Sequence, residues 1–479
     1  MSLKARAISG VKWNAIKMGV ITTLHFITLA VLARLLSPSD FGLMGMIMVV
    51  IGFAQAFTGM GLSNAIIQRQ DVPESHLSSF FWINVLTGFG LFICTLLIRP
   101  LAAIYFKEAT LSNYLIFAAF IFLITPVGQI FNTLLRKKLM FKTLAKIEIL
   151  GTVAYSVSSI GLALGKFGVL SLIFGQLMRS LCTVCILFFV FRRIWLPRLH
   201  LSIKEIKSYL SFGAFQMGER TVDYLRSNID YIIIGRFLGP EALGFYTLAY
   251  QLITFPLSKI NPIITGVAFP AFSRIQDDNS RMRSGYCKVI NYISMLSFPM
   301  LVGMIVVAPE FIRLVYGAKW EPSVIVVQLF CLAGIFWSLG NPIGSVLLAK
   351  GRADIGFYWN VFAVIITSIA VIIGVNWGIV GVAVVLVILE VPFFFIIQPI
   401  VNRLIDLKLS HYFKAIQSPF LCSVIMLAGI VFLKMIFINI NMLPLFIMLV
   451  VAGAAIYIII YYILDRTVFS ELKSMVKGD

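Results

Sequence analysis

The chain has 479 residues, of which 60% are hydrophobic and 12% are charged. Soluble globular proteins are only about 45–50% apolar, so this composition excludes an ordinary soluble protein and predicts one that crosses a membrane many times. The formal net charge is +19; because most basic residues lie in predicted loops, the charge indicates orientation in the membrane and not nucleic-acid binding.

Hydrophobic stretches of about 20 residues recur along nearly the whole chain and predict an all-α membrane protein with about fourteen transmembrane helices. The predicted spans are 11–36, 41–67, 77–98, 111–135, 144–165, 168–191, 209–235, 242–268, 286–309, 323–348, 355–375, 379–402, 413–434 and 443–464. With both termini in the cytoplasm, the basic loops 136–146, 192–207 and 274–288 lie on the cytoplasmic side, as the positive-inside rule requires. The longest outward loops are then expected near 99–112 and 310–322.

The seventh predicted span, 209–235, carries a stripe of charge. At roughly 100° per residue its five charged residues fall within an arc of about 120°: Glu219, Arg220, Asp223, Arg226 and Asp230. The other side of the helix is apolar and includes Leu225. A charge at the bilayer centre costs at least roughly 2.5–3.5 kcal/mol. The stripe is therefore expected to face protein or a wet cavity, which is typical of a transporter.

An internal repeat relates spans 1–6 to spans 7–12. ARLLSPSDFG (33–42) aligns with GRFLGPEALG (235–244), and four aligned positions are identical: Arg34/Arg236, Leu36/Leu238, Pro38/Pro240 and Gly42/Gly244. Six spans are an even number, so both halves have the same orientation and the expected twofold axis lies along the membrane normal. We predict an N-lobe at 1–200, a C-lobe at 201–405, and two additional helices with a cytoplasmic tail at 406–479.

Further charges lie in other predicted spans, namely Lys17, Arg179, Lys259 and Glu390. One interpretation is that they form interhelical ion pairs that fix packing. In the other, the basic residues bind an anionic head group, since arginine in particular matches phosphate. The candidates for that site are Arg220, Arg226, Arg179, Lys17 and Lys259. Buried carboxylates can carry a coupling H⁺ or Na⁺, and the candidates are Glu219, Asp223, Asp230 and Glu390.

No enzyme signature is present in the sequence. It has neither a P-loop nor an H-E-x-x-H motif, and its four histidines are scattered. Cys182 and Cys185 form a C-x-x-C pair within a predicted span without a nearby histidine, so we expect no metal site. We therefore expect a protein that is not an enzyme, holds no cofactor and does not use ATP directly.

Several stretches resemble one family in order along the chain. They are ISGVKWNAI (8–16), LARLLSPSDFGLMGM (32–46), LSNAIIQR (62–69), NIDYIIIGRFLGPEALGFYTLAYQL (228–252), KINPIITGVAFPAFSRIQDD (259–278) and NPIGSVLLAKGRADIGF (341–357). They are similar to the polysaccharide flippases of the multidrug/oligosaccharidyl-lipid/polysaccharide exporter superfamily. The colanic-acid and teichuronic-acid exporter group is the most similar.

The resemblance implies two six-helix lobes around a central cavity. It also implies a bacterial cytoplasmic-membrane protein that flips an undecaprenyl-diphosphate-linked oligosaccharide outward by alternating access. Membrane lipids surround such a protein, and a polysaccharide polymerase and assembly proteins are its candidate partners. Three alternatives remain at this point: a multidrug/cation antiporter of the same superfamily, a peptidoglycan lipid-precursor flippase, and a non-transporting scaffold. The basic candidates disfavour a carrier of cationic drugs, because like charges repel.

Overall fold

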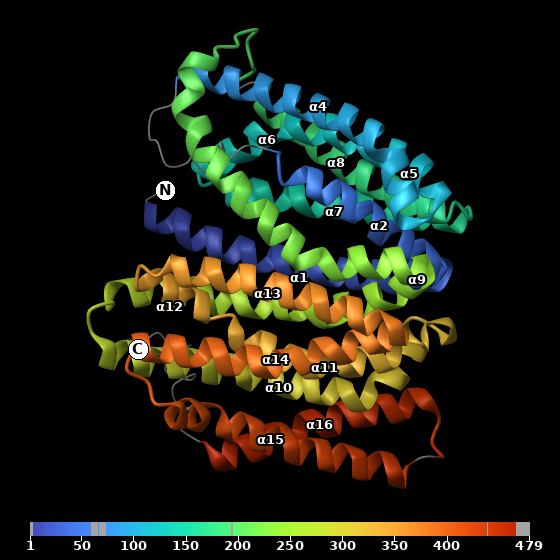
Figure 1. The fold of residues 1–479 in the computed structure, drawn as a ribbon, viewed down its shortest axis with the longest axis vertical. Coiled ribbons are helices and arrows are strands. Elements are labelled where there is room, and N and C mark those ends of the chain that lie inside the picture. Colours follow the sequence, from blue (N-terminus) through green and yellow to red (C-terminus); the bar gives the residue numbers. More distant parts are fainter. Residues whose placement is uncertain (1–2, 59–65, 67–72, 193–194, 438, 466–479) are drawn as a thin grey trace. The chain divides into compact units, whose positions relative to one another are not determined.

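The computed structural model describes residues 3–58, 66, 73–192, 195–437 and 439–465, and for 3–12, 203–220, 223, 260–265 and 267 it describes the backbone alone. Within these residues every regular element is helical, as the composition predicted (Figure 1). The chain divides into two compact units, Met1–Gly244 and Phe245–Asp479. The lobes predicted from the repeat, with a boundary after residue 200, stay a prediction.

The first unit contains seven complete helices and the beginning of an eighth among the described residues. They are α1 (Leu3–Leu35), α2 (Pro38–Gln55), α4 (Glu74–Phe106), α5 (Ala109–Ala119), α6 (Ile121–Lys137), α7 (Phe141–Leu164), α8 (Val169–Phe191) and the first part of α9 (Ile203–Arg274). Helix α7 packs between α1 and α8, while α4 packs along α5 and α6. Aromatic side chains such as Phe80, Phe131 and Phe191 fill the core between α4, α6 and α8.

The second unit begins within α9 and continues through the C-terminal helices. They are α10 (Asn279–Val315), η1 (Ala318–Trp320), α11 (Ser323–Gly340), α12 (Ile343–Ala349), α13 (Ala353–Gly374), η2 (Val375–Trp377), α14 (Gly378–Leu404), α15 (Leu409–Ile436) and α16 (Met442–Leu464). Helix α10 packs against α11, α15 and α16. Tyr286 and Tyr412 belong to one core cluster, and Leu449 and Cys422 belong to another.

Eleven helical stretches among the described residues are long and apolar enough to cross a membrane. One of them, Ala353–Leu404, has 52 residues and is interrupted at η2, between the predicted spans 355–375 and 379–402. Helix α9 has 72 residues and is interrupted at Gly239, where φ is 81°. A straight helix of that length would measure roughly 108 Å, far more than the roughly 30 Å hydrocarbon layer. The helices are thus compatible with fourteen spans, a number that stays a prediction.

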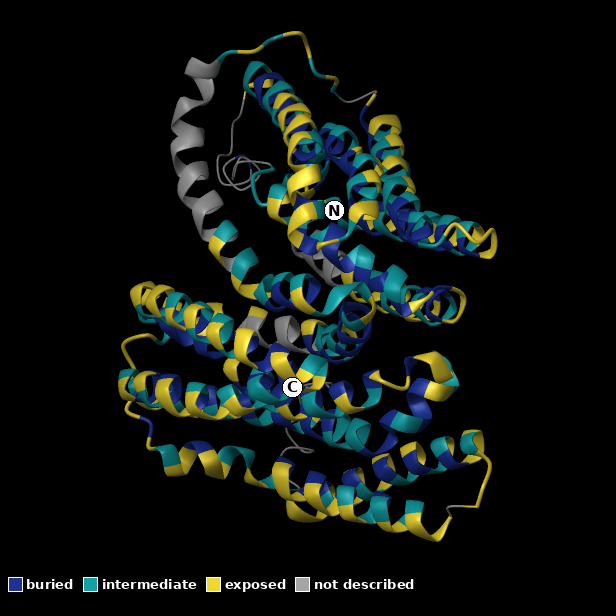
Figure 2. Ribbon diagram, turned by 45° about the vertical axis from the view of Figure 1, so that its right-hand side comes forward, coloured by how far each residue is buried: buried dark blue, intermediate teal, exposed yellow. Residues whose placement is uncertain are grey.

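Exposed and buried residues alternate along these helices (Figure 2), and many of the exposed ones are large hydrophobic residues. In α16 the buried residues repeat every four positions, from Leu445 through Leu449 and Tyr457 to Tyr461. Between them, Val451 and Ile463 are 62% and 63% exposed. A helix that is apolar on all sides but buried along only one seam is suited to lipid on the others.

Two helices extend further than the sequence predicted. The predicted outward loops near 99–112 and 310–322 are largely helical, because α4 continues to Phe106 and α10 to Val315. The sequence predicts that Glu310 lies in the outward loop after the span 286–309. In the structure its carboxylate lies 2.8 Å from the Lys434 ammonium of α15, so the charge is compensated and the helix continues.

The repeated motif begins a helix in each half of the chain. In the first copy Ser37 and Asp40 form a capping box, and Pro38 occupies the first turn of α2. In the second copy Gly239 adopts the positive φ that interrupts α9, and Pro240 begins its second arm. A proline at such a start costs no hydrogen bond, because the first N–H groups of a helix have no helical partner.

The two copies contact each other reciprocally. A Cβ atom added to Gly42 would lie 1.6 Å from the Pro240 carbonyl oxygen, and one added to Gly244 would lie 1.8 Å from that of Pro38. Glycine is therefore required at both positions, since any side chain would overlap the opposite backbone. The glycine of each copy contacts the proline of the other copy, which is the pattern that a twofold relation produces.

Candidate functional site

The first arm of α9 carries the predicted charged stripe. The side chains of Glu219, Arg220 and Asp223 lie outside the described residues. Arg226 is exposed, whereas Asp230, one turn later, is only 7% exposed and accepts a hydrogen bond from the Tyr231 N–H at 3.0 Å. At roughly 100° per residue they lie about 100° and 140° around the helix from Leu225.

The apolar face of the same arm packs on α2. The Tyr224 hydroxyl donates to the Met48 carbonyl at 2.8 Å and lies 3.2 Å from that of Val49. Its ring fits over Gly52, where an added Cβ would lie 2.3 Å from the hydroxyl oxygen. This contact fixes which face of α9 meets α2, and so which face carries the charges.

Lys17 of α1 pairs with a carboxylate of α7. Its ammonium lies 3.1 Å from the Glu148 carboxylate, and the two side chains are 22% and 30% exposed. Further along the same helices the Thr28 hydroxyl donates to Ser156 at 2.7 Å. The residue numbers of both partners increase from the first contact to the second, so α1 and α7 are parallel. The predicted first and fifth spans should be parallel too.

Arg179 borders the same helix from the other side. It lies on α8, is half-buried, and its Cγ would be 3.6 Å from a Cβ atom at Gly151 of α7. The missing side chain at Gly151 therefore lets α8 approach α7. Lys17 and Arg179 consequently lie against one helix, α7, and Glu148 compensates the charge of Lys17.

The candidates in the second unit lie beside aromatic rings. The Lys259 ammonium is 5.3 Å from the centre of the Phe255 ring. Glu390 of α14 accepts a hydrogen bond from the Trp337 indole N–H of α11 at 2.8 Å. The Trp337 ring in turn lies 5.7 Å from that of Tyr250. Sequence reasoning identified Glu390 but missed Trp337. The available signal was that Trp337 lies in the middle of a predicted span, where its indole N–H needs a hydrogen-bond partner.

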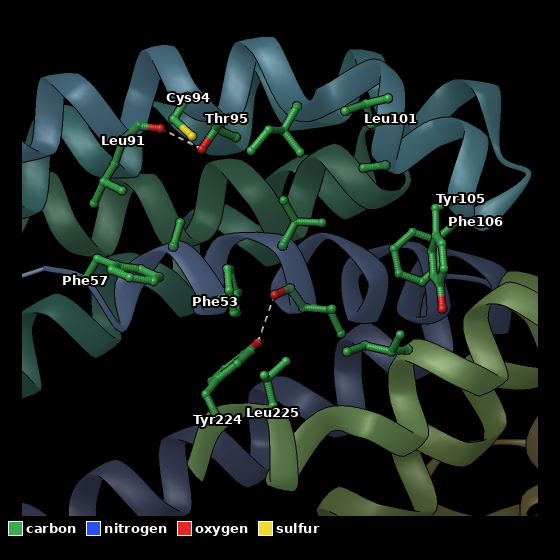
Figure 3. A pocket seen from close by; sticks show the side chains of 16 residues that line it. Phe53, Phe57, Leu91, Cys94, Thr95, Leu101, Tyr105, Phe106, Tyr224 and Leu225 are labelled. Atoms are coloured by element: carbon green, nitrogen blue, oxygen red, sulfur yellow. Dashed lines mark hydrogen bonds between the residues drawn. The ribbon is translucent and has the colours of Figure 1, made fainter. Parts of the chain in front are cut away.

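An apolar pocket of about 420 Å³ lies between α2, α4 and the first arm of α9 (Figure 3). Phe53 of α2, Ile98 and Leu101 of α4, and Tyr224 of α9 are among the residues that line it. Arg236 lies at the end of this pocket marked by Tyr105, with its guanidinium 5.5 Å from the centre of that ring. The sequence singled out Arg236 as a repeated residue but gave no reason to assign it a function.

No three His, Cys, Asp or Glu side chains in the described part of the chain are grouped closely enough to hold a metal ion. Basic and acidic side chains lie on membrane helices, and a separate pocket presents almost only carbon.

A family model described as "Polysaccharide biosynthesis protein" matches residues 31–325. The chain is 37% identical to the teichuronic acid biosynthesis protein TuaB of Bacillus subtilis, over 89% of this chain and 88% of that protein. It is 33% identical to the lipopolysaccharide biosynthesis protein WzxC of Escherichia coli, over 88% and 86%.

Among solved structures, the lipid II flippase MurJ in an inward closed conformation matches with a TM-score of 0.78 and 16% identity, over 96% of this chain and 100% of that one. An inward-facing multidrug resistance transporter of the MATE family matches with a TM-score of 0.60 and 14% identity, over 80% and 95%. At these identities the likeness concerns the fold, which is that of multi-helix membrane transporters.

Proposed function

Because the chain belongs to the polysaccharide biosynthesis protein family, we propose that it is a flippase for surface polysaccharide biosynthesis. Its substrate is an undecaprenyl-diphosphate-linked oligosaccharide, which it moves from the cytoplasmic to the outer leaflet by alternating access. The observation that carries the proposal is the near-complete alignment with relatives named for teichuronic acid and lipopolysaccharide biosynthesis. The fold that it shares with a lipid II flippase supports the same mechanism.

The diphosphate is the part of this substrate that basic side chains recognise. Exposed Arg226 can offer a bidentate fork to phosphate, and its charge does not titrate. Lys17 must leave its ion pair with Glu148 to bind the diphosphate. Such an exchange of partners suits a residue that binds substrate in only one state of the alternating-access cycle. Arg179, Arg220 and Lys259 complete the proposed set.

The driving ion is H⁺ or Na⁺, carried by carboxylates in the membrane helices. Asp230 and Glu390 are the described members of this set, and Glu219 and Asp223 are the others. The Trp337 indole N–H donates to Glu390 at 2.8 Å and so fixes the orientation of this carboxylate.

The proposed location is the bacterial cytoplasmic membrane, with both termini in the cytoplasm. The basic loops on that side support this orientation. A polysaccharide polymerase and assembly proteins are the proposed partners, since the flipped unit must be joined to others on the outer side.

A deletion strain tests the function directly. We expect loss of surface polymer, with the undecaprenyl-diphosphate-linked oligosaccharide accumulating on the cytoplasmic side. Normal polymer together with increased drug sensitivity would contradict the proposal and favour a multidrug exporter. Analysis of the accumulated lipid would also identify the sugar.

A further inference from the structure

The apolar pocket of the first unit is long and narrow. Its α4 wall extends from Leu91 to Tyr105 along one face of the helix, a distance of roughly 21 Å at 1.5 Å per residue. Figure 3 shows the lining side chains spread along α2 and α4 in the same direction. A pocket of this shape suits a chain-like ligand better than a compact one. We call it the α2–α4 slot.

Two of the three lining hydroxyls bond to backbone carbonyls, and the third belongs to Tyr105, which is 43% exposed. The Thr95 hydroxyl donates to the Leu91 carbonyl within its own helix at 2.8 Å, and the Tyr224 hydroxyl donates to the Met48 carbonyl at 2.8 Å. Water or sugar would find almost nothing to bond to in the slot. Hydrocarbon is the ligand that such a surface accepts.

One edge of the slot is open. Ile98, Leu101 and Tyr105 line it on α4 and are 42%, 64% and 43% exposed. A lipid chain can therefore enter sideways along α4 without unfolding the helices.

A positive charge closes one end. Arg236 donates through one terminal nitrogen to the Ile104 carbonyl at 3.0 Å and to the Tyr105 carbonyl, at the C-terminus of α4. A guanidinium has five N–H donors, so these bonds leave capacity for phosphate oxygens. An apolar slot that ends in arginine is complementary to a lipid with a long tail and an anionic head.

We propose that the α2–α4 slot binds the isoprenoid tail of the lipid-linked oligosaccharide, with the diphosphate at Arg236; this inference rests on the proposed function. In the predicted orientation Arg236 lies at the outer end of the seventh span. The slot therefore holds the lipid after translocation, before it leaves for the outer leaflet. The site is distinct from the charged stripe, which lies on the opposite face of the same α9 arm.

Photo-crosslinking in lipid nanodiscs tests this site. The probe is a polyprenyl diphosphate that carries a benzophenone in its tail, and the labelled peptide is identified by mass spectrometry. We expect labelling on the 91–105 stretch of α4, and competition by undecaprenyl diphosphate at far lower concentration than by phosphatidylglycerol. Equal competition by the two lipids, or labelling confined to other helices, would overturn the proposal.

Variants locate the tail and the head separately. Ala54→Phe and Ile98→Trp fill the slot and should abolish labelling of α4, while Leu97→Phe, at a position 70% exposed outside the lining, is the matched control. Arg236→Gln should weaken probe binding by roughly tenfold, the equivalent of one charge-assisted hydrogen bond, and Arg236→Lys by less. Ile98 is already 42% exposed, so its variant should fold even if Ala54→Phe does not.

Translocation by the wild-type protein is measured in the same preparation. If the wild type translocates while both slot variants still label and transport as it does, this inference is wrong and the proposed function survives. If the wild type does not translocate a lipid-linked oligosaccharide at all, the proposed function itself fails.

Discussion

Arg226 is the described basic residue that most directly tests the head-group proposal. It is exposed on the charged face of the first α9 arm, opposite the packing contact of Tyr224 with α2. We expect Arg226→Ala to reduce export of surface polymer by at least roughly tenfold, because a charge-assisted contact to phosphate is lost. Arg281→Ala is the control, since that side chain is 78% exposed in a short-range pair with Asp278. Polymer output equal in the two variants would remove Arg226 from the substrate path.

The Glu310–Lys434 ion pair joins α10 to α15, and the sequence did not reveal it. Lys434 also donates to the Val306 carbonyl at 2.9 Å, and the Glu310 side chain is only 10% exposed. Glu310→Gln should destabilise the packing of α15 on α10 by roughly 1–3 kcal/mol, because a buried partner is lost. Thermal unfolding in detergent measures this as a lowered midpoint.

The matched control for that change is Glu321→Gln. Its pair with Arg313 is about half exposed, at 54% and 45%. Exposed pairs contribute only about 0–1 kcal/mol, so the midpoint should hardly change. Equal shifts for the two variants would show that burial does not determine the strength of these pairs.

The sequence indicated which residues were unusual but not which residues they contact. The charges of Lys17 and Glu390 were recognisable as anomalies in apolar segments, but their partners Glu148 and Trp337 are far away in sequence. Hydropathy does not register ion pairs between distant residues such as Glu310 and Lys434. It therefore predicts an end of the ninth span at 309, although α10 continues to Val315. Arg236 was visible only as half of a repeated pair.

At the scale of elements, the repeated motif is the feature that sequence and structure describe most consistently. The four identities between 33–42 and 235–244 predicted that both stretches have equivalent roles. In the structure each begins a helix, and the glycine of each lies against the proline carbonyl of the other. The sequence could not indicate this contact, since it depends on how the two stretches pack.

The reciprocal contact makes a paired prediction. Gly42→Ala and Gly244→Ala should each lower stability by roughly 1–3 kcal/mol through overpacking, and by similar amounts because their surroundings are equivalent. Gly19→Ala is the control, as an added Cβ would meet no atom within 4 Å. Alanine is favoured over glycine in a helix, so this variant should be at least as stable as the wild type. A large effect at only one of the two motif positions would contradict the equivalence.

Proline marks only some of the helix breaks. The predicted span 323–348 is divided between α11 and α12 around Pro342, whereas 111–135 is divided between α5 and α6 at Phe120, and Pro126 lies inside α6. Gly88 packs against the Phe122 carbonyl, where an added Cβ would lie 2.3 Å from the oxygen. Proline at 126 cannot donate to that carbonyl, so the close approach of α4 uses a site that the missing N–H leaves open.

At the scale of the whole molecule, the first α9 arm separates two kinds of chemistry. One face carries charge and the other completes an apolar slot, so the same helix offers a polar and an apolar surface. Composition and hydropathy were sufficient to predict the all-α membrane architecture, and the quoted stretches identified the family. The slot could not be predicted, because it is formed by three helices whose apolar faces look like ordinary packing surfaces in sequence.

The carboxylate set makes a prediction for the entire transport cycle. Asp230→Asn and Glu390→Gln should retain binding of a polyprenyl diphosphate but lose most of the acceleration of translocation by an imposed H⁺ or Na⁺ gradient. Asp406→Asn is a control, because that carboxylate accepts a hydrogen bond from Asn279 at an exposed position. If both variants respond to the gradient as strongly as the wild type does, these carboxylates do not couple the ion to transport.

The most direct test of the central claim is translocation in sealed proteoliposomes that contain the purified protein and an undecaprenyl-diphosphate-linked oligosaccharide. The fraction of lipid reached by an enzyme or lectin outside the vesicles is followed over time, with and without an ion gradient. The flippase proposal predicts that lipid from the inner leaflet becomes accessible in a protein-dependent manner and faster with the gradient. Accessibility that stays at the level of protein-free vesicles under every gradient would contradict it.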